Sequence, residues 1–290
     1  MVMAQVGKPL EDVLRPYRDL IEERLRAVPP GCECDASLKD AMTYALEGGK
    51  RLRGAILLSF HEALGGKAVD AMGFAASLEM IHAYSLVHDD LPCIDDDDFR
   101  RGKPSCHKKF GYATALLAGD ALLTAAFEVA ASSPALPPGA VLRGISELSR
   151  AAGPSGMVGG QVLDLGMEGE TGGPARVRKT YRMKTGALFQ VSAKIGAVLA
   201  GAAEHVVKAA GDWGSLFGYA YQVLDDLEDL EQEQEKDTLA RETSPEDARR
   251  EAEDALLGSL RVLGVFGGRA NLAETLSQHY LARSRPQRNQ

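Results

Sequence analysis

Apolar side chains recur every three or four positions along most of the chain, whereas alternating runs of β-branched residues are nearly absent. This periodicity predicts an all-α fold. Clusters of glycine and proline separate the periodic segments, as in SSPALPPG (132–139). The predicted helices cover residues 10–27, 36–47, 51–64, 71–91, 111–131, 138–151, 156–168, 175–183, 186–200, 204–230, 245–263 and 271–284. Because no change in composition marks a boundary, we expect residues 1–290 to form a single domain of ten or more helices.

Two of these helices become acidic at their C-terminal ends. SLVHDDLPCID (85–95) and YQVLDDLEDL (221–230) both continue apolar stretches. Carboxylates are unfavourable at a helix C-terminus, because the helix dipole is negative there. Residues spaced i, i+3, i+7 share one face of a helix. The polar residues with this spacing are His82, Ser85 and Asp89 in the first helix and Gln222, Asp225 and Asp229 in the second.

The residue types in the two clusters indicate a magnesium site. Oxygen ligands with few histidines nearby suit Mg²⁺, which completes its shell with water and phosphate oxygens. An EF-hand loop is excluded, because its sixth position should be glycine and the corresponding residues are Ile94 and Leu230. A single acidic cluster is more often a solvated helix end. Two clusters, with Arg100 and Arg101 beside the first, favour magnesium that bridges to a diphosphate.

The net charge limits the partners that the chain can have. At −8 the protein lacks the basic face that a nucleic acid would need, so we expect no nucleic-acid partner. Basic residues nevertheless gather locally, in GGKRLRG (48–54) and FRRGK (99–103). Such a local basic patch in an acidic protein favours a small anionic ligand.

Other features of the sequence favour a soluble, cytoplasmic protein. The four cysteines form no CxxC pair and no recognisable zinc site, as is common in a reducing compartment. The N-terminal residues lack the apolar core of a signal peptide. We expect no membrane span, because Glu79, His82 and His88 interrupt the longest apolar helix.

Five motifs, in the same order, resemble those of the trans-isoprenyl diphosphate synthase family, most closely its bacterial farnesyl diphosphate synthase branch. The motifs are GGKRLR (48–53), HDDLPCIDDDDFRRGKPSCHKKFG (88–111), GGQVLDL (159–165), KTGAL (184–188) and YQVLDD (221–226). The resemblance implies a helical bundle of the isoprenoid synthase type around a deep central cavity, and a homodimer. It also implies a Mg²⁺-dependent enzyme, with Mn²⁺ as a substitute, that condenses isopentenyl diphosphate with dimethylallyl or geranyl diphosphate.

The resemblance further implies a role for each matching residue. The residues that would hold Mg²⁺ on the allylic diphosphate are Asp89 and Asp95, with Asp90 nearby. Those that would hold a third ion on the opposite wall are Asp225 and its supports, Asp226 and Asp229. The contacts to the allylic diphosphate would come from Arg100 and Lys184, and those to isopentenyl diphosphate from Lys50, Arg53, His82 and Arg101. The residues that would line the reacting region are Gln161, Asp164, Thr185 and Gln222.

The chain departs from the family pattern after the second acidic cluster. The family carries there a loop with glycines and two lysines, which closes over the diphosphate. Residues 225–243 are shorter and contain no glycine. Lys236 matches the second lysine, and the first has no counterpart. A weakly active partner subunit of a heteromeric synthase is therefore one alternative, although such a subunit should have lost aspartates.

Product length is expected to depend on Tyr84, which lies five residues before Asp89. At 1.5 Å per helical residue its ring would lie about 7.5 Å along the helix, where it can form a floor beneath the growing chain. The small Ser85 beside it leaves the neighbouring face open. In the bacterial farnesyl-forming enzymes that the chain resembles, an aromatic residue stands at this position, so we expect farnesyl diphosphate as the product.

Two further functions stay open at this point. A geranylgeranyl diphosphate synthase would differ only in the depth of its floor. A class I terpene cyclase would need the acidic clusters but no isopentenyl diphosphate pocket. The presence of Lys50, Arg53, His82 and Arg101 disfavours the cyclase.

Overall fold

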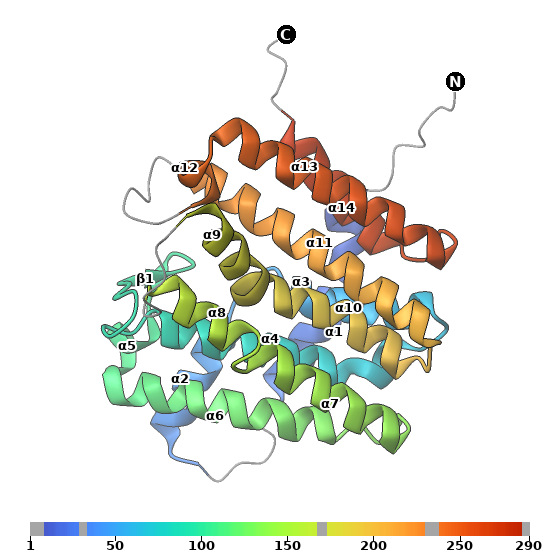
Figure 1. Cartoon of the computed structure of the whole chain (residues 1–290). Coiled ribbons are helices and arrows are strands. Elements are labelled where there is room, and N and C mark those ends of the chain that lie inside the picture. Colours follow the sequence, from blue (N-terminus) through green and yellow to red (C-terminus); the bar gives the residue numbers. More distant parts are fainter. Residues whose placement is uncertain (1–8, 29–33, 167–172, 230–237, 286–290) are drawn as a thin grey trace.

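The computed structural model describes residues 9–28, 34–166, 173–229 and 238–285. Almost all regular structure in these ranges is helical, which confirms the all-α prediction (Figure 1). Each predicted helix is present, with its ends shifted by a few residues. The α-helices are α1 (Leu10–Arg26), α2 (Ala36–Leu46), α3 (Leu52–Ala63), α4 (Met72–Asp89), α5 (Cys106–Phe110), α6 (Tyr112–Ala131), α7 (Pro138–Ala152), α8 (Met157–Asp164), α9 (Pro174–Thr180), α10 (Ala187–Leu199), α11 (Glu204–Asp229), α12 (Leu239–Glu242), α13 (Pro245–Val262) and α14 (Asn271–Ser284).

The sequence pattern missed several elements that are too short to show a period. These are α5, α12, the 3₁₀ turns η1 (Ala68–Ala71) and η3 (Leu263–Phe266), and the antiparallel strands β1 (Phe99–Arg100) and β2 (Lys103–Pro104). The strands are joined by Arg101 and Gly102, which both have positive φ, as a two-residue hairpin turn requires. The hairpin follows directly on the first acidic cluster.

The predicted break between helices 175–183 and 186–200 is wrong. A π-helical turn, η2 (Tyr181–Gly186), joins α9 to α10 without interruption. A π turn contains one residue more than an α turn, and such turns are frequent at functional sites. Gly186 of KTGAL is the last residue of η2.

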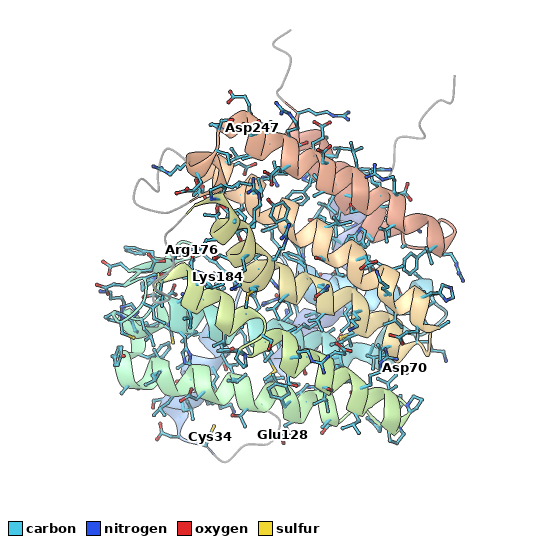
Figure 2. The ribbon with its side chains drawn as sticks, in the orientation of Figure 1. Cys34, Asp70, Glu128, Arg176, Lys184 and Asp247 are labelled. Atoms are coloured by element: carbon cyan, nitrogen blue, oxygen red, sulfur yellow. The ribbon has the colours of Figure 1, made fainter. Side chains whose placement is uncertain are left out.

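Large apolar side chains fill the space between the helices. Trp213 and Phe217 of α11 stack with ring centres 5.0 Å apart, and Phe60 of α3 lies 5.2 Å from Trp213. Aromatic burial of this kind dominates core energetics. In Figure 2 the exposed side chains of Glu128 and Asp247 lie at the outside of the bundle, whereas Lys184 lies among the helices. The core thus fixes the positions of α4 and α11, which carry the acidic clusters.

One helix in the described part of the chain, α6, has the length and mean hydropathy (1.4) of a membrane span. Long apolar helices in the core of a helical bundle have the same properties. α6 packs along α4 and α2, which accounts for one of its apolar faces.

Candidate active site

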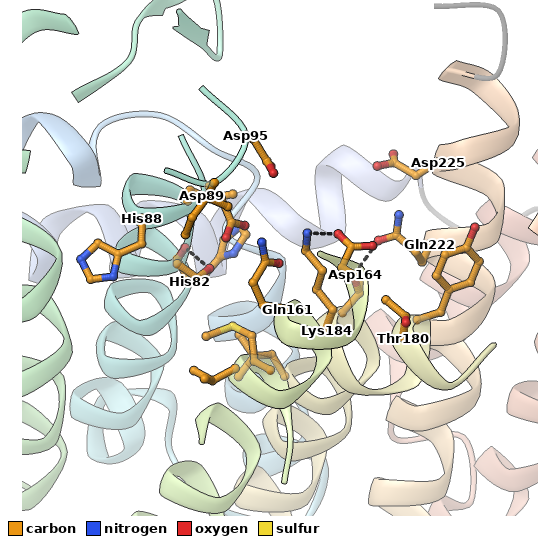
Figure 3. Close-up of a pocket in the computed structure, with 18 of the residues that line it drawn as sticks. His82, His88, Asp89, Asp95, Gln161, Asp164, Thr180, Lys184, Gln222 and Asp225 are labelled. Atoms are coloured by element: carbon orange, nitrogen blue, oxygen red, sulfur yellow. Dashed lines mark hydrogen bonds and ion pairs between the residues drawn. The ribbon is translucent and has the colours of Figure 1, made fainter. Parts of the chain in front are cut away.

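A cavity of about 550 Å³ opens between α4, α8, η2 and α11. The aspartates that line it are Asp89, Asp95, Asp164, Asp225, Asp226 and Asp229. Figure 3 shows Asp89 and Asp95 on one side of the cavity and Asp225 on the other. The ends of two helices that are distant in sequence therefore present carboxylates to the same space.

The first acidic wall is formed by the end of α4 and the turn that follows it. The backbone N–H of Asp95 donates to the carbonyl of Asp89 at 2.9 Å, so the chain folds back and brings both residues to the cavity. Burial raises the pKa of Asp89 to about 6; the charge of Lys184 reduces this effect and that of Asp95 adds to it. The raised pKa indicates that negative charge at this wall is only partly compensated by the protein.

Asp90 is placed differently from its neighbour Asp89. It is buried, and its Oδ1 accepts hydrogen bonds from the Nε (2.8 Å) and Nη2 atoms of Arg100. Arg100 also donates to Asp97 at 2.7 Å and lines the cavity. Asp90 therefore orients a cation toward the cavity.

The second acidic wall is formed by the last turns of α11. Asp225 and Asp229 line the cavity, and partial desolvation of Asp225, together with the charge of Asp229, raises the pKa of Asp225. Asp226 is buried: Gln222 donates to its Oδ1 at 2.6 Å, and the Tyr181 hydroxyl donates to its Oδ2.

The two walls fit magnesium only together with ligands from outside the protein. Among the described residues, no three histidine, cysteine or acidic side chains lie close enough to hold an ion by themselves. The available donors, Asp89 and Asp95 opposite Asp225 and Asp229, are all carboxylate oxygens, the type that Mg²⁺ prefers. Magnesium commonly binds through one or two carboxylates plus phosphate and water, and this arrangement suits that mode.

Arg53 and His82 line the cavity beside the first wall. The guanidinium of Arg53 lies 4.6 Å from the centre of the Phe189 ring. Its buried Nε has no hydrogen-bond partner within the described ranges. Burial and the charges of Arg53 and Arg101 lower the pKa of His82 well below its usual value, so the imidazole is neutral. The unpartnered Nε is a donor available to an anion.

The other two predicted contacts to isopentenyl diphosphate lie outside this cavity. Lys50 is exposed. Arg101 lines a smaller cavity of about 90 Å³ and donates from Nη1 to the carbonyls of Glu47 and Gly48, each at 3.0 Å. A Cβ at Gly49, which has φ of 98°, would lie 3.0 Å from the Arg101 guanidinium. Arg101 thus packs against the glycine turn that presents Lys50.

Arg51 stabilises the same turn from inside the protein. It is buried with φ of 54°, in the left-handed region, and its Nε donates to Glu22 at 2.7 Å. Glu79 lies 3.8 Å from its Nη1 and accepts from the backbone N–H of Gly54 at 2.8 Å. Sequence reasoning missed Glu22 and Glu79 as partners, because their helices, α1 and α4, are remote in sequence.

Lys184 projects from η2 into the cavity and forms an ion pair with Asp164 of α8 at 2.5 Å (Figure 3). The two elements touch through their backbones. A Cβ at Gly160 would lie 2.2 Å from the backbone nitrogen of Lys184, so no larger residue fits there without a shift of the backbone. This close approach explains the second glycine of GGQVLDL.

Three polar side chains complete the wall between the acidic clusters. The Thr185 hydroxyl donates to Gln222 Oε1 at 2.6 Å. The buried amide nitrogen and oxygen of Gln161 have no hydrogen-bond partner among the residues described. Because unpaired buried amides are costly, Gln161 is available to a ligand or to water.

Tyr84 and Ser85 line the cavity one to two turns before Asp89. Tyr84 is buried, with its ring centre 5.7 Å from that of His88 in an edge-on contact. The Ser85 hydroxyl donates to the His82 carbonyl at 2.9 Å. Lys236 lies outside the described residues.

Residues 35–241 match the family model described as polyprenyl synthetase. The chain is 43% identical over 237 residues to farnesyl diphosphate synthase of Geobacillus stearothermophilus, which covers 81% of this chain and 79% of the relative. It is 39% identical over 258 residues to geranylgeranyl pyrophosphate synthase 12, chloroplastic, of Arabidopsis thaliana, covering 80% and 71%.

Solved structures resemble the whole bundle. The apo crystal structure of an FPP/GFPP synthase from Zymomonas mobilis superposes with a TM-score of 0.88 at 33% identity, covering 93% of this chain and 98% of that one. The geranyltranstransferase of Thermotoga maritima gives a TM-score of 0.81 at 32% identity, covering 92% and 98%.

Proposed function

The chain belongs to the polyprenyl synthetase family, and on this premise we propose that it condenses isopentenyl diphosphate with dimethylallyl or geranyl diphosphate to form farnesyl diphosphate. The family resemblance carried by the five motifs is confirmed. The protein is thus a transferase of prenyl groups. The observation that carries the proposal is the meeting of two carboxylate walls with Lys184, Arg100 and Arg53 around one cavity.

The carboxylates are proposed to hold Mg²⁺, or Mn²⁺ in its place, together with the allylic diphosphate. Asp89 and Asp95 would supply ligands on one side, and Asp225, supported by Asp229, on the other. Bound magnesium would supply Lewis-acid neutralisation of the departing diphosphate. The raised pKa values of Asp89 and Asp225 support this role, because a bound cation would compensate carboxylates that burial, and to a smaller extent neighbouring carboxylates, make costly to ionise.

The basic residues are proposed to bind the two diphosphates separately. Arg100, held by Asp90, and Lys184 would contact the allylic diphosphate. The contacts to isopentenyl diphosphate would come from Lys50, Arg53, His82 and Arg101. The available Nε of Arg53 supports this assignment, and a neutral His82 can donate one hydrogen bond to a phosphate oxygen.

The reaction then needs no protein nucleophile. The allylic C–O bond breaks and diphosphate departs; the double bond of isopentenyl diphosphate attacks the allylic cation; a proton is lost to the released diphosphate. Thr185, Gln161 and Gln222 would surround the reacting carbons, and Asp164 would fix Lys184 by its ion pair. Oriented dipoles at such a wall favour the transition state.

Product length is proposed to be set by Tyr84, and its buried ring at the cavity wall supports this role. Geranylgeranyl diphosphate is the alternative product, since geranylgeranyl synthases are also similar to this chain. A terpene cyclase is disfavoured by the buried donor on Arg53. Both acidic walls are present, which disfavours a weakly active partner subunit of a heteromeric synthase.

We further propose a single-domain, cytoplasmic protein that acts as a homodimer without a membrane span. The exposed apolar side chains of Tyr112, Leu116 and Leu117 on α6 support a self-association surface. Measurement of the molar mass in solution at two protein concentrations tests the proposed homodimer.

The proposed activity is tested by incubation with isopentenyl diphosphate, dimethylallyl or geranyl diphosphate, and Mg²⁺. We expect a fifteen-carbon diphosphate, identified by chain length after dephosphorylation. Cyclic hydrocarbons from geranyl or farnesyl diphosphate alone would instead establish a cyclase, and no product with any allylic partner would refute the proposal.

A further inference from the structure

We propose that Tyr181 is a positioning residue for the proposed reaction and that its hydroxyl sets the orientation of Thr185 at the cavity wall. The assignment rests on the proposed function, in which Thr185 lies beside the reacting carbons. Two side chains of α11, Asp226 and Gln222, connect the two hydroxyls. None of the five sequence motifs includes Tyr181.

The orientation begins at Asp226, which receives a donor at each carboxylate oxygen. Because a carboxylate only accepts, Gln222 must turn its NH₂ group toward it, and Nε2 donates to Oδ1 at 2.6 Å. The Gln222 carbonyl oxygen consequently faces Thr185, which donates its hydroxyl proton to it at 2.6 Å. The Thr185 proton is thereby committed, and only the lone pairs of that oxygen are left for other contacts.

Tyr181 fixes the opposite end of this chain of hydrogen bonds. The backbone N–H of Leu239, the first residue of α12, donates to the Tyr181 hydroxyl at 3.0 Å. The single hydroxyl proton of Tyr181 therefore goes to Asp226. Burial and the charge of Asp226 raise the pKa of Tyr181, so it stays protonated. Tyr181 also begins η2, the turn that carries Lys184 and Thr185.

The direction of the Thr185 hydroxyl matters because the reaction develops positive charge on carbon. An oxygen lone pair stabilises a nearby cation, whereas a hydroxyl proton pointing at it is repelled. Without the Tyr181 hydroxyl, the Asp226 carboxylate loses the donor at Oδ2, and it can turn so that Oδ1 no longer faces Gln222 Nε2. We expect kcat to fall and the KM values to change little, because these hydrogen bonds do not involve Arg100, Lys184 or Arg53, the groups proposed to hold the diphosphates.

The test compares Tyr181→Phe with Tyr219→Phe. Tyr219 lies on the same helix as Gln222, its ring centre is 6.3 Å from that of Tyr181, and its hydroxyl donates to Glu251 at 2.6 Å. Each variant loses one hydroxyl from a hydrogen bond to a carboxylate. We expect kcat to fall about tenfold in Tyr181→Phe, with both KM values within about twofold of wild type, and to be unchanged in Tyr219→Phe.

A double-mutant cycle separates positioning from general destabilisation. In a Thr185→Val background no hydroxyl is left to orient, so adding Tyr181→Phe should lower kcat no further. Additive losses, or equal kcat in the two tyrosine variants, would overturn the role of Tyr181 while leaving the proposed function intact. A wild-type protein that forms no prenyl product would overturn the proposed function, and this assignment with it.

Discussion

The two aspartate pairs of the protein, Asp89–Asp90 and Asp225–Asp226, look alike in sequence but are built differently. In both, the first residue lines the cavity with a raised pKa and the second is buried. Asp90 is paired with the guanidinium of Arg100, whereas Asp226 accepts hydrogen bonds from neutral donors of the described residues Gln222 and Tyr181. The same dipeptide thus orients a cation on one wall and hydroxyl and amide dipoles on the other.

The largest expected effect on activity comes from replacing the first residue of either pair, Asp89 or Asp225. Asp89→Asn or Asp225→Asn should lower kcat/KM at least about 100-fold, because each removes a charge that no other group on its wall replaces in the same position. Steady-state assays at saturating Mg²⁺ measure this. Excess EDTA should abolish turnover in the wild type, and full activity in EDTA would end the metal proposal.

A second test asks whether Arg53, on α3, binds isopentenyl diphosphate independently of the allylic diphosphate held at the two acidic walls. Arg53→Lys keeps the charge but loses the planar donor set, so KM for isopentenyl diphosphate should rise about tenfold. KM for the allylic substrate should barely change. The opposite pattern would show that the two diphosphate sites are exchanged. Lys39→Arg, a change on α2 away from the cavity, serves as the control.

The second residues of the two pairs, Asp226 and Asp90, should affect different kinetic parameters: kcat for Asp226 and KM for Asp90. In Asp226→Asn, one carboxylate oxygen becomes an NH₂ group, which cannot accept a hydrogen bond from Gln222 or Tyr181. This favours a flip of the Gln222 amide, so kcat should fall about tenfold. Asp90→Asn leaves Arg100 with Asp97, so KM for the allylic substrate should rise only about threefold.

Kinetics of both asparagine variants with each substrate varied in turn provide the measurement. If both changes lowered kcat equally, the contrast between a cation-orienting and a dipole-orienting pair would not hold.

The smallest effect on rate, and the largest on product, is expected at Tyr84. Tyr84→Ala should extend the cavity and shift products to twenty carbons or more, with the overall rate within about threefold of wild type. Tyr84→Phe keeps the ring and should still give fifteen carbons. Chromatography of dephosphorylated products reads both. An unchanged distribution in the alanine variant would place the floor elsewhere and would limit control of length to a part of the cavity other than α4.

Helical periodicity was sufficient to predict the fold and the two acidic faces, because α4 and α11 are long and keep regular spacing up to their carboxylates. It could not predict that Lys184 and Thr185 lie on a π turn, since one extra residue within a helix leaves no periodic signal. Nor could it reveal that Lys50 is exposed while Arg53 lines the cavity. That difference depends on the left-handed conformation of Arg51 and on its contact with Glu22.

The absence of space beside Gly160 bears on how the substrate range of this protein can be engineered. Any side chain at that position would displace the backbone of Lys184. Substitutions of Gly160 in a mutant library would therefore yield enzymes in which the lysine is misplaced. Val158 and Val162 lie on the same helix, border the cavity and are partly open to solvent. They are the positions where new side chains can reshape the cavity without disturbing the lysine.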